Sequence, residues 1–280
     1  MSNKTLRIIP LGGLGEVGKN MTIYEYNQQI LIVDAGLMFP DNDMIGIDYI
    51  IPDFEYVKER ASKVKGIIIT HGHEDHTGAI GHLLEYVNAP VYATPLTNGL
   101  IKNKLNRRGM AVEPKLVDIQ AGESVQIGPF KVDFFHVCHS VPDGVGIGID
   151  TPAGLVVHTG DYKLDHTPID GRPTDYGKLA EFARKGVLAL LADSTNAERP
   201  GWTASERVIN DAFEKVFYRA KGRIIVATFA SLISRMQQVL ETAKKHDRKV
   251  SFVGLSMTEN VRIARELGYL SYDEDQVVST

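Results

Sequence analysis

The pattern of apolar and polar residues divides the chain into a strand-rich part and a later part in which helices and strands alternate. Short β-branched or apolar runs between turn residues predict strands over 7–11, 21–26, 30–34, 66–70, 91–94, 124–127, 130–137, 145–150, 155–158 and 187–192. Residues 77–88 repeat their apolar side chains with the 3.6-residue spacing of a helix. We expect two sheets covered by outer helices, with the strand over 187–192 buried.

The character of the chain changes at a polar loop with Pro and Gly over 196–203. Beyond it, the pattern predicts helices over 203–220, 231–246 and 258–267, alternating with strands over 224–229 and 250–255. A capping box, Thr203 to Glu206, opens the first of these helices. The alternation indicates βαβ units and a parallel sheet. Because two or three strands make a poor sheet, we expect a truncated chain: one domain over 1–200 and part of another over 201–280.

The composition, with 43% hydrophobic and 24% charged residues, is ordinary for a globular protein of 280 residues. A formal net charge of −4 gives no overall attraction to nucleic acid or anionic lipid. A local basic stretch comprises Lys102, Lys104, Arg107 and Arg108. It favours a solvated helix face, with a phosphate-contacting edge as the alternative.

Cys138 is the single cysteine of the chain, so a disulfide within the chain is impossible and a reducing compartment is indicated. Residues 1–7 contain no apolar segment of the kind found in secretory signals. No stretch approaches the roughly 20 apolar residues that a membrane span needs. We therefore expect a cytoplasmic protein that does not bind membranes.

The densest chemical signal is the run from Thr70 to His76, in which His71, His73, Asp75 and His76 supply four potential metal ligands. His71 and His73 are two residues apart just past a strand, and this spacing places both imidazoles on one side. Imidazole and carboxylate groups suit zinc or a similar metal. A surface loop of ordinary histidines is the alternative, but only nine histidines occur in the chain.

Two further candidate ligands follow later strands. His139 comes after the strand over 130–137, and Asp161 comes after the strand over 155–158. Because a carboxylate can bridge two cations, Asp161 is the natural bridge between two metals. His158 and His136 lie inside strands, where a core or supporting role is favoured.

A glycine pattern over Gly13 to Gly18 matches the GxGxxG sequence of dinucleotide-binding loops. That fingerprint requires a helix directly afterwards. Residues 21–26 alternate like a strand instead. The pattern therefore favours a hairpin loop that approaches the metals, and dinucleotide binding is disfavoured.

The HxHxDH run, the later His139 and Asp161 together resemble the metallo-β-lactamase superfamily over residues 7 to about 195. Asp34 looks like that superfamily's early aspartate, which supports the histidine loop. Residues 191–195 resemble the acidic motif that opens the insertion of the β-CASP nucleases, and residues 12–21 and 34–53 look like ribonuclease J. The resemblance implies an α/β fold: an αββα sandwich over 1–200, followed by the start of a parallel β-CASP domain.

The resemblance also implies how the candidate residues divide. His71, His73 and His139 would hold a first divalent ion, Asp75 and His76 a second, and Asp161 would bridge them. Zinc is expected, with manganese as the alternative. Asp75 and Asp193 are the expected catalytic residues, and Asp193 would orient a proton-donating histidine beyond Thr280. Capping of the loop after its strand is the other interpretation of Asp193.

The expected function is that of a cytoplasmic ribonuclease J-like enzyme that cuts RNA internally and from the 5′ end. It would mature ribosomal RNA and degrade messenger RNA, with RNA as its partner and a homo-oligomeric complete protein. The β-CASP nucleases supply two histidines after the insertion, so we expect residues 1–280 alone to be weakly active or inactive. The alternatives are a thioester or ester hydrolase of the same fold and an inactive RNA-binding fragment.

Overall fold

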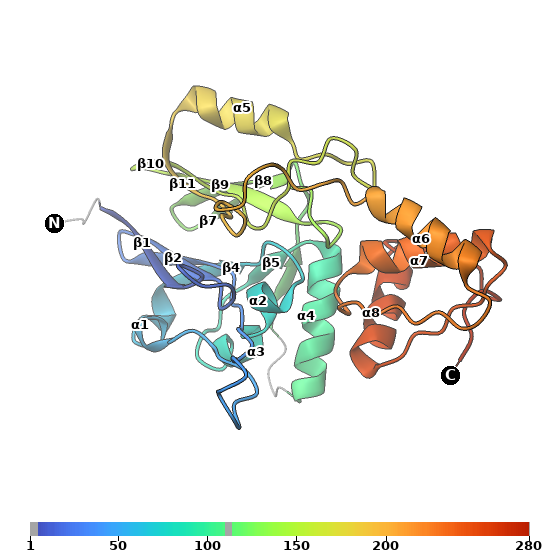
Figure 1. Ribbon diagram of the computed structural model, residues 1–280. Coiled ribbons are helices and arrows are strands. Elements are labelled where there is room, and N and C mark those ends of the chain that lie inside the picture. Colours follow the sequence, from blue (N-terminus) through green and yellow to red (C-terminus); the bar gives the residue numbers. More distant parts are fainter. Residues whose placement is uncertain (1–4, 110–113, 280) are drawn as a thin grey trace. The chain divides into compact units, whose positions relative to one another are not determined.

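The computed structural model describes residues 5–109 and 114–279, and its helices and strands are drawn in Figure 1. Residues 1–4, part of the segment interpreted above as lacking a secretory signal, lie outside the described residues. The chain forms two compact units. The first unit comprises Met1–Val137, Asp143–Tyr162 and Asp175–Arg199, and the second comprises Cys138–Pro142, Lys163–Thr174 and Pro200–Thr280.

The first unit contains two sheets. One has the order β1 (Leu6–Gly12), β2 (Met21–Tyr26), β3 (Gln29–Val33), β4 (Val64–Ile68), β5 (Val91–Ala93) and β6 (Leu116–Asp118). The other has the order β11 (Val187–Leu191), β10 (Gly154–His158), β9 (Val145–Thr151), β8 (Phe130–His136) and β7 (Ser124–Ile127). β1, β2 and β3 are antiparallel, whereas β3 to β6 are parallel; β11 is parallel to β10 in an otherwise antiparallel sheet.

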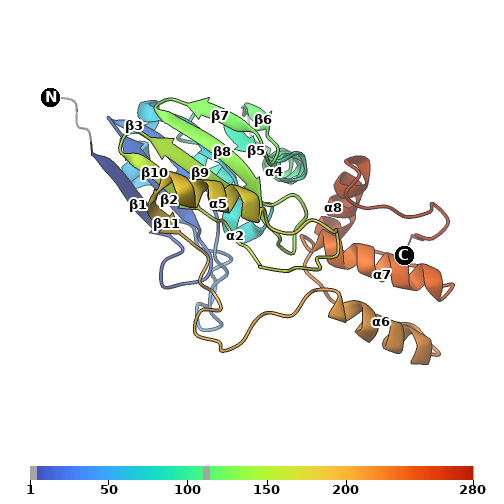
Figure 2. The same cartoon turned by 90° about the horizontal axis from the view of Figure 1, so that it is seen from above.

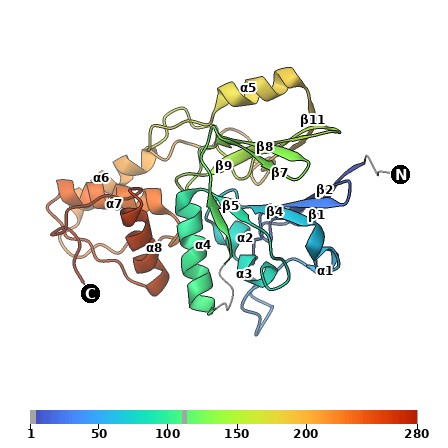
Figure 3. The same ribbon diagram turned by 180° about the vertical axis from the view of Figure 1, so that it is seen from behind.

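The sheets stack face to face because each turns alternate apolar side chains toward the other. Leu31 and Ile68 of the first sheet pack in one core with Phe134 and Ile147 of the second. Figure 3 shows α5 (Tyr176–Lys185) outside the second sheet and α1 (Glu55–Lys58), α2 (Glu74–Thr77), α3 (Ile80–Leu83) and α4 (Pro95–Arg108) on the side of the first. A short 3-10 helix, η1 (Ala61–Lys63), precedes β4. The expected αββα sandwich is confirmed.

The helix predicted over 77–88 is wrong in extent, because two short helices, α2 and α3, occupy 74–83. The neighbouring segment Ala35–Leu37 accounts for the break. Ala35 N donates to His76 O, Leu37 N donates to Glu74 O, and Ala79 N donates to Ala35 O. The Ala79 amide therefore donates to Ala35 and not to a carbonyl one turn earlier, as it would within a continuous helix.

The prediction that 187–192 is a buried strand is wrong about burial. β11 forms, but it is the last strand of its sheet order, and Leu188 and Leu190 are 58% and 63% exposed. A wholly apolar run is the usual sign of a strand covered on both faces. In the described part of the chain, no element covers this face of β11.

The second unit contains α6 (Val208–Arg219), α7 (Ile233–Lys245) and α8 (Leu255–Glu266), drawn from above in Figure 2. α6 begins later than the capping box predicts, because the Ser205 hydroxyl accepts from Arg207 N just ahead of it. The strands predicted over 224–229 and 250–255 are not formed as ladders in the described residues. A single bridge joins Val250 to Val277.

The basic stretch lies on α4, as the favoured interpretation of a helix face predicts. Lys104 Nζ is 2.7 Å from Glu74 Oε2, and Arg108 pairs with Glu85. Half of this stretch is therefore neutralised by acidic neighbours. Among the helices of the described residues, none has the length and apolar character to cross a membrane.

Candidate metal centre

The histidine motif begins where β4 ends. Ile69 N still donates to Tyr92 O of the neighbouring strand, and the chain then leaves the sheet at Thr70. His71 is 2% exposed, and His73 is the residue directly before α2. The first turn of α2 carries Asp75 and His76. A strand end followed at once by a helix thus presents all four motif side chains within one short segment.

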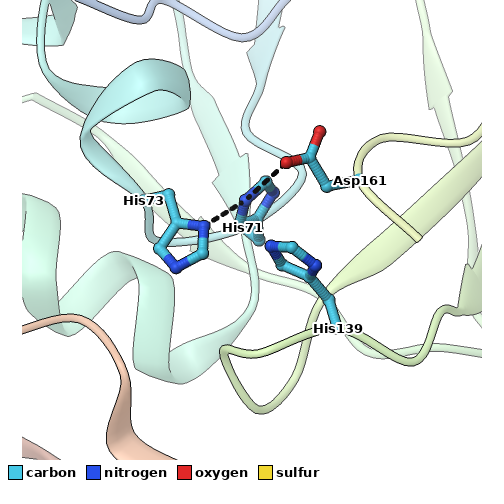
Figure 4. A group of neighbouring side chains, drawn as sticks. All are labelled: His71, His73, His139 and Asp161. Carbon is cyan, nitrogen blue, oxygen red and sulfur yellow. Dashed lines mark hydrogen bonds and ion pairs between the residues drawn. The ribbon is translucent and has the colours of Figure 1, made fainter. Parts of the chain in front are cut away.

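The structure brings the six predicted ligands into two groups. The ligand atoms of His71, His73, His139 and Asp161 lie within 4.8 Å of one another (Figure 4). Those of Asp75, His76 and Asp161 form a second group within the same limit. Asp161 belongs to both groups, so its carboxylate is the shared member.

The distances within the groups are those of donor atoms facing a common point. His71 Nε2 is 3.1 Å from His73 Nδ1 and 3.9 Å from Asp161 Oδ2. His76 Nε2 is 3.2 Å from Asp161 Oδ1 and 3.5 Å from Asp75 Oδ2. The two oxygens of Asp161 therefore face different histidines, as a bridging carboxylate requires.

Asp34 supports the histidine motif through contacts with Thr70 and His76. It is 1% exposed, and its Oδ2 lies 2.8 Å from His76 Nδ1, while Thr70 N donates to its Oδ1 at 2.8 Å. With Nδ1 engaged by Asp34, His76 presents Nε2 to Asp75 and Asp161. A carboxylate on the far nitrogen fixes the orientation of a ligating imidazole and makes it more basic.

The electrostatics of the histidines differ. Burial lowers the pKa of His76, but the neighbouring Asp34 and Asp161 outweigh it and raise that pKa well above its usual value. Burial lowers the pKa of His73, and this effect prevails over nearby carboxylates. His73 therefore favours the neutral form, which is the form that binds metals.

The glycine loop reaches the second group, as the hairpin interpretation predicts. Asn20 N donates to Asp75 O at 3.0 Å, and Asn20 Nδ2 is 3.2 Å from His76 Nε2. Gly36 lies against the same segment, where a Cβ would be 1.5 Å from Asp75 O. Sequence reasoning missed Asn20 as a site residue, although it follows the glycine pattern that was singled out by only two residues.

The donor set fits a divalent cation. Three imidazoles and a carboxylate converge in the first group, and two carboxylates and an imidazole converge in the second. Nitrogen and carboxylate oxygen in these numbers are the ligands of zinc-type sites.

The backbone of Asp193 is linked to the turn that carries Asp161. Asp193 N donates to the Oγ1 of Thr159 at 3.2 Å, and Thr159 lies two residues before Asp161. Its carboxylate accepts from Thr195 N at 2.8 Å, so it caps the turn after β11. This capping is compatible with either interpretation of Asp193.

Comparison with known proteins agrees with this site. The profile of the metallo-β-lactamase superfamily matches residues 14–198, and the chain belongs to that superfamily. Residues 221–280 match the profile described as ribonuclease J, beta-CASP domain. The expected resemblance and fold class are thereby confirmed.

Individual relatives carry the names ribonuclease J and ribonuclease J2. The chain is 45% identical to ribonuclease J of Synechocystis sp., over 98% of this chain and 43% of the relative. It is 42% identical to ribonuclease J2 of Bacillus subtilis, over 99% of this chain and 50% of the relative. The chain thus spans half or less of the length of these relatives.

A solved structure shows the same fold at low sequence identity. A protein of unknown function from Enterococcus faecalis superposes with a TM-score of 0.70 at 14% identity. The match covers 98% of this chain and 73% of the other. This likeness concerns the arrangement of the backbone.

Proposed function

We propose that this chain provides the metal-binding part of a ribonuclease that hydrolyses phosphodiester bonds in RNA. The observation that carries the proposal is the sharing of Asp161 by two donor groups, His71–His73–His139 and Asp75–His76. Relatives named ribonuclease J, at 42% to 46% identity, support RNA as the substrate.

His71, His73, His139 and Asp161 would hold one divalent ion, and Asp75, His76 and Asp161 the other. Imidazole-rich sets suit zinc, with manganese as the alternative. A pair of such ions lowers the pKa of water and stabilises negative charge on phosphate oxygens. The net charge of −4 does not oppose RNA binding, because two bound cations would add positive potential at the site, where the local field matters more than the overall sum.

The protein's own residues prepare this chemistry. Asp34 engages Nδ1 of His76, so Nε2 is the ring nitrogen that faces Asp75 and Asp161. Asp75 O accepts a hydrogen bond from Asn20 N, and Gly36 leaves the room beside this oxygen that a side chain would fill. We assign Asp193 the role of orienting a proton donor, with its turn-capping contact as a fixed support.

We further propose the division into a metallo-β-lactamase domain over 1–200 and a part of a β-CASP domain over 201–280. Profile matches to 14–198 and 221–280 support it. Internal cutting and 5′ trimming of RNA, maturation of ribosomal RNA, decay of messenger RNA, a cytoplasmic location and oligomerisation extend the proposal from the ribonuclease J relatives.

The substrate class is tested with the full-length protein, of which residues 1–280 are a part, loaded with zinc or manganese. A labelled single-stranded RNA should be cleaved, cleavage should stop with chelator, and binding should weaken as salt rises. A glutathione thioester offered under the same conditions should remain intact. Hydrolysis of the thioester with intact RNA would instead favour the ester-hydrolase alternative.

Asn20→Ala should weaken metal binding at the second group while leaving the first unchanged. The substitution removes the side-chain amide that lies beside Asp75 and His76. Loss of such a supporting contact typically costs about 10- to 100-fold in metal affinity. Titration of chelator-stripped protein with Co²⁺ measures the effect, and Asn106→Ala at an exposed position of α4 is the matched control. Equal affinities in Asn20→Ala and wild type would refute a supporting role.

A further inference from the structure

A polar pair, one buried and one half-buried residue, joins the two sheets of the first unit. The Tyr24 hydroxyl is 2.8 Å from His158 Nδ1. Tyr24 belongs to β2 of the first sheet, and His158 is the last residue of β10 in the second. Tyr24 is fully buried in an otherwise apolar core that includes Leu31 and Phe134. In such surroundings a polar atom needs its partner, so the pair is a specific link between the sheets.

The direction of this hydrogen bond follows from the surroundings. Burial, and then the nearby Asp34, raise the pKa of Tyr24 far above its usual value, so the phenol keeps its proton. Burial lowers the pKa of His158, so its imidazole is neutral. Of two neutral groups, a phenol is the better donor and an imidazole nitrogen the better acceptor, so we assign the Tyr24 hydroxyl as the donor to Nδ1, which places the ring proton of His158 on Nε2.

The turn after His158 carries Asp161 and is fixed at several points. Thr159 N donates to Leu191 O at 3.0 Å. Gly160 has a φ of 58°, and a Cβ there would lie 3.1 Å from Thr70 Cβ. Thr70 is in turn hydrogen-bonded to Asp34. The hydrogen bond between His158 and Tyr24 adds a further contact that holds the start of this turn.

We propose that Tyr24 is a positioning residue that acts through His158 to set the place of the Asp161 carboxylate between the two donor groups. A carboxylate shared by two donor groups must be fixed relative to both. The hydrogen bond between Tyr24 and His158 anchors β10 of one sheet to β2 of the other, three residues before Asp161. The proposal rests on the metal-binding role proposed for Asp161 and is independent of the substrate.

Tyr24→Phe in the full chain removes the hydroxyl and keeps the ring. Titration of chelator-stripped protein with Co²⁺ should show an affinity lower by about tenfold, the low end of the range for supporting residues. The visible absorption of bound Co²⁺, which depends on ligand geometry, should also change. Tyr26→Phe is the matched control, since Tyr26 lies two residues further along β2 against the same core, and it should change neither quantity.

Two further measurements separate positioning from general stability. In a His158→Ala background, Tyr24→Phe should cause no additional loss of Co²⁺ affinity, because the hydrogen bond through which Tyr24 acts on Asp161 is already absent. In wild-type protein, the ¹⁵N chemical shifts of His158 should report a proton on Nε2, and in Tyr24→Phe this signature should shift.

The outcomes that overturn the proposal are distinct. A lower melting temperature of Tyr24→Phe with unchanged Co²⁺ affinity and spectrum would make Tyr24 a stabilising residue only. An equal loss of affinity with and without His158 would exclude the route through that histidine. Wild-type protein that binds no Co²⁺ would refute the proposed metal centre, and with it this role of Tyr24.

Discussion

Asp161→Asn is expected to abolish tight metal binding at both donor groups and to lower RNA hydrolysis by far more than 100-fold. Asp161 is the one residue that belongs to both groups, and its two oxygens face His71 and His76. Loss of a merely supporting residue already costs about 10- to 100-fold. An amide nitrogen in place of one oxygen removes a negative charge and a donor atom. Metal analysis after dialysis and cleavage of labelled RNA by the full-length protein measure the two effects.

The matched control is Asp150→Asn, which makes the same chemical change at an exposed position of β9. It should retain wild-type metal content and activity. Two fully occupied metal sites in Asp161→Asn would contradict the bridging assignment. Retention of one site only would show that the two groups do not depend on Asp161 equally.

Asp34→Ala is expected to destabilise the metal-free protein by about 3 kcal/mol or more, the usual cost of removing one partner from a buried charged pair. The substitution leaves the Thr70 amide and His76 Nδ1 without their acceptor in a buried site. Asp34 also has a φ of 63°, which costs alanine about another 1–2 kcal/mol. Urea unfolding in the presence of chelator measures the difference.

Asp34→Asn separates the two causes, because asparagine tolerates a positive φ and keeps one acceptor oxygen. It should lose clearly less stability than Asp34→Ala. Equal stability of Asp34→Ala and wild type would mean that the contacts of Asp34 with Thr70 and His76 contribute nothing to the fold.

The candidate site could be predicted from sequence to a large extent because its residues occur at ends of regular elements. His71 to His76 follow β4 directly, and Asp161 follows β10 by three residues. Local patterns locate strand ends well, and the residue types at these ends identify the candidate metal ligands. The structure brings all six predicted ligands together, while their roles toward metal stay predictions until measured.

The parts of the fold that sequence reasoning missed depend on contacts between distant segments. The break between α2 and α3 arises from Ala35, which lies more than 30 residues earlier and takes the amide of Ala79. The exposure of Leu190 depends on which strand ends the sheet. Neither fact is encoded in the local alternation of apolar and polar residues.

The strands predicted over 224–229 and 250–255 illustrate the same limit. Their apolar residues favour extended backbone, and the described structure leaves them without ladders apart from the bridge at Val250. A strand is stabilised by its neighbours rather than by its own sequence. The helices α7 and α8 were predicted nearly in full, because a helix satisfies its hydrogen bonds within itself.

The origin of the donor atoms in two different sheets has a mechanical consequence. His71 and His76 are carried by the first sheet through β4, whereas Asp161 is carried by the second through β10. With a single cysteine, the chain has no internal disulfide to join these layers. A bound cation would join the two layers as a removable crosslink. It would raise the free energy of unfolding by about 4 kcal/mol when free metal is at 1,000 times its dissociation constant. The metal content of a preparation would then be a gauge of how completely the two layers have assembled.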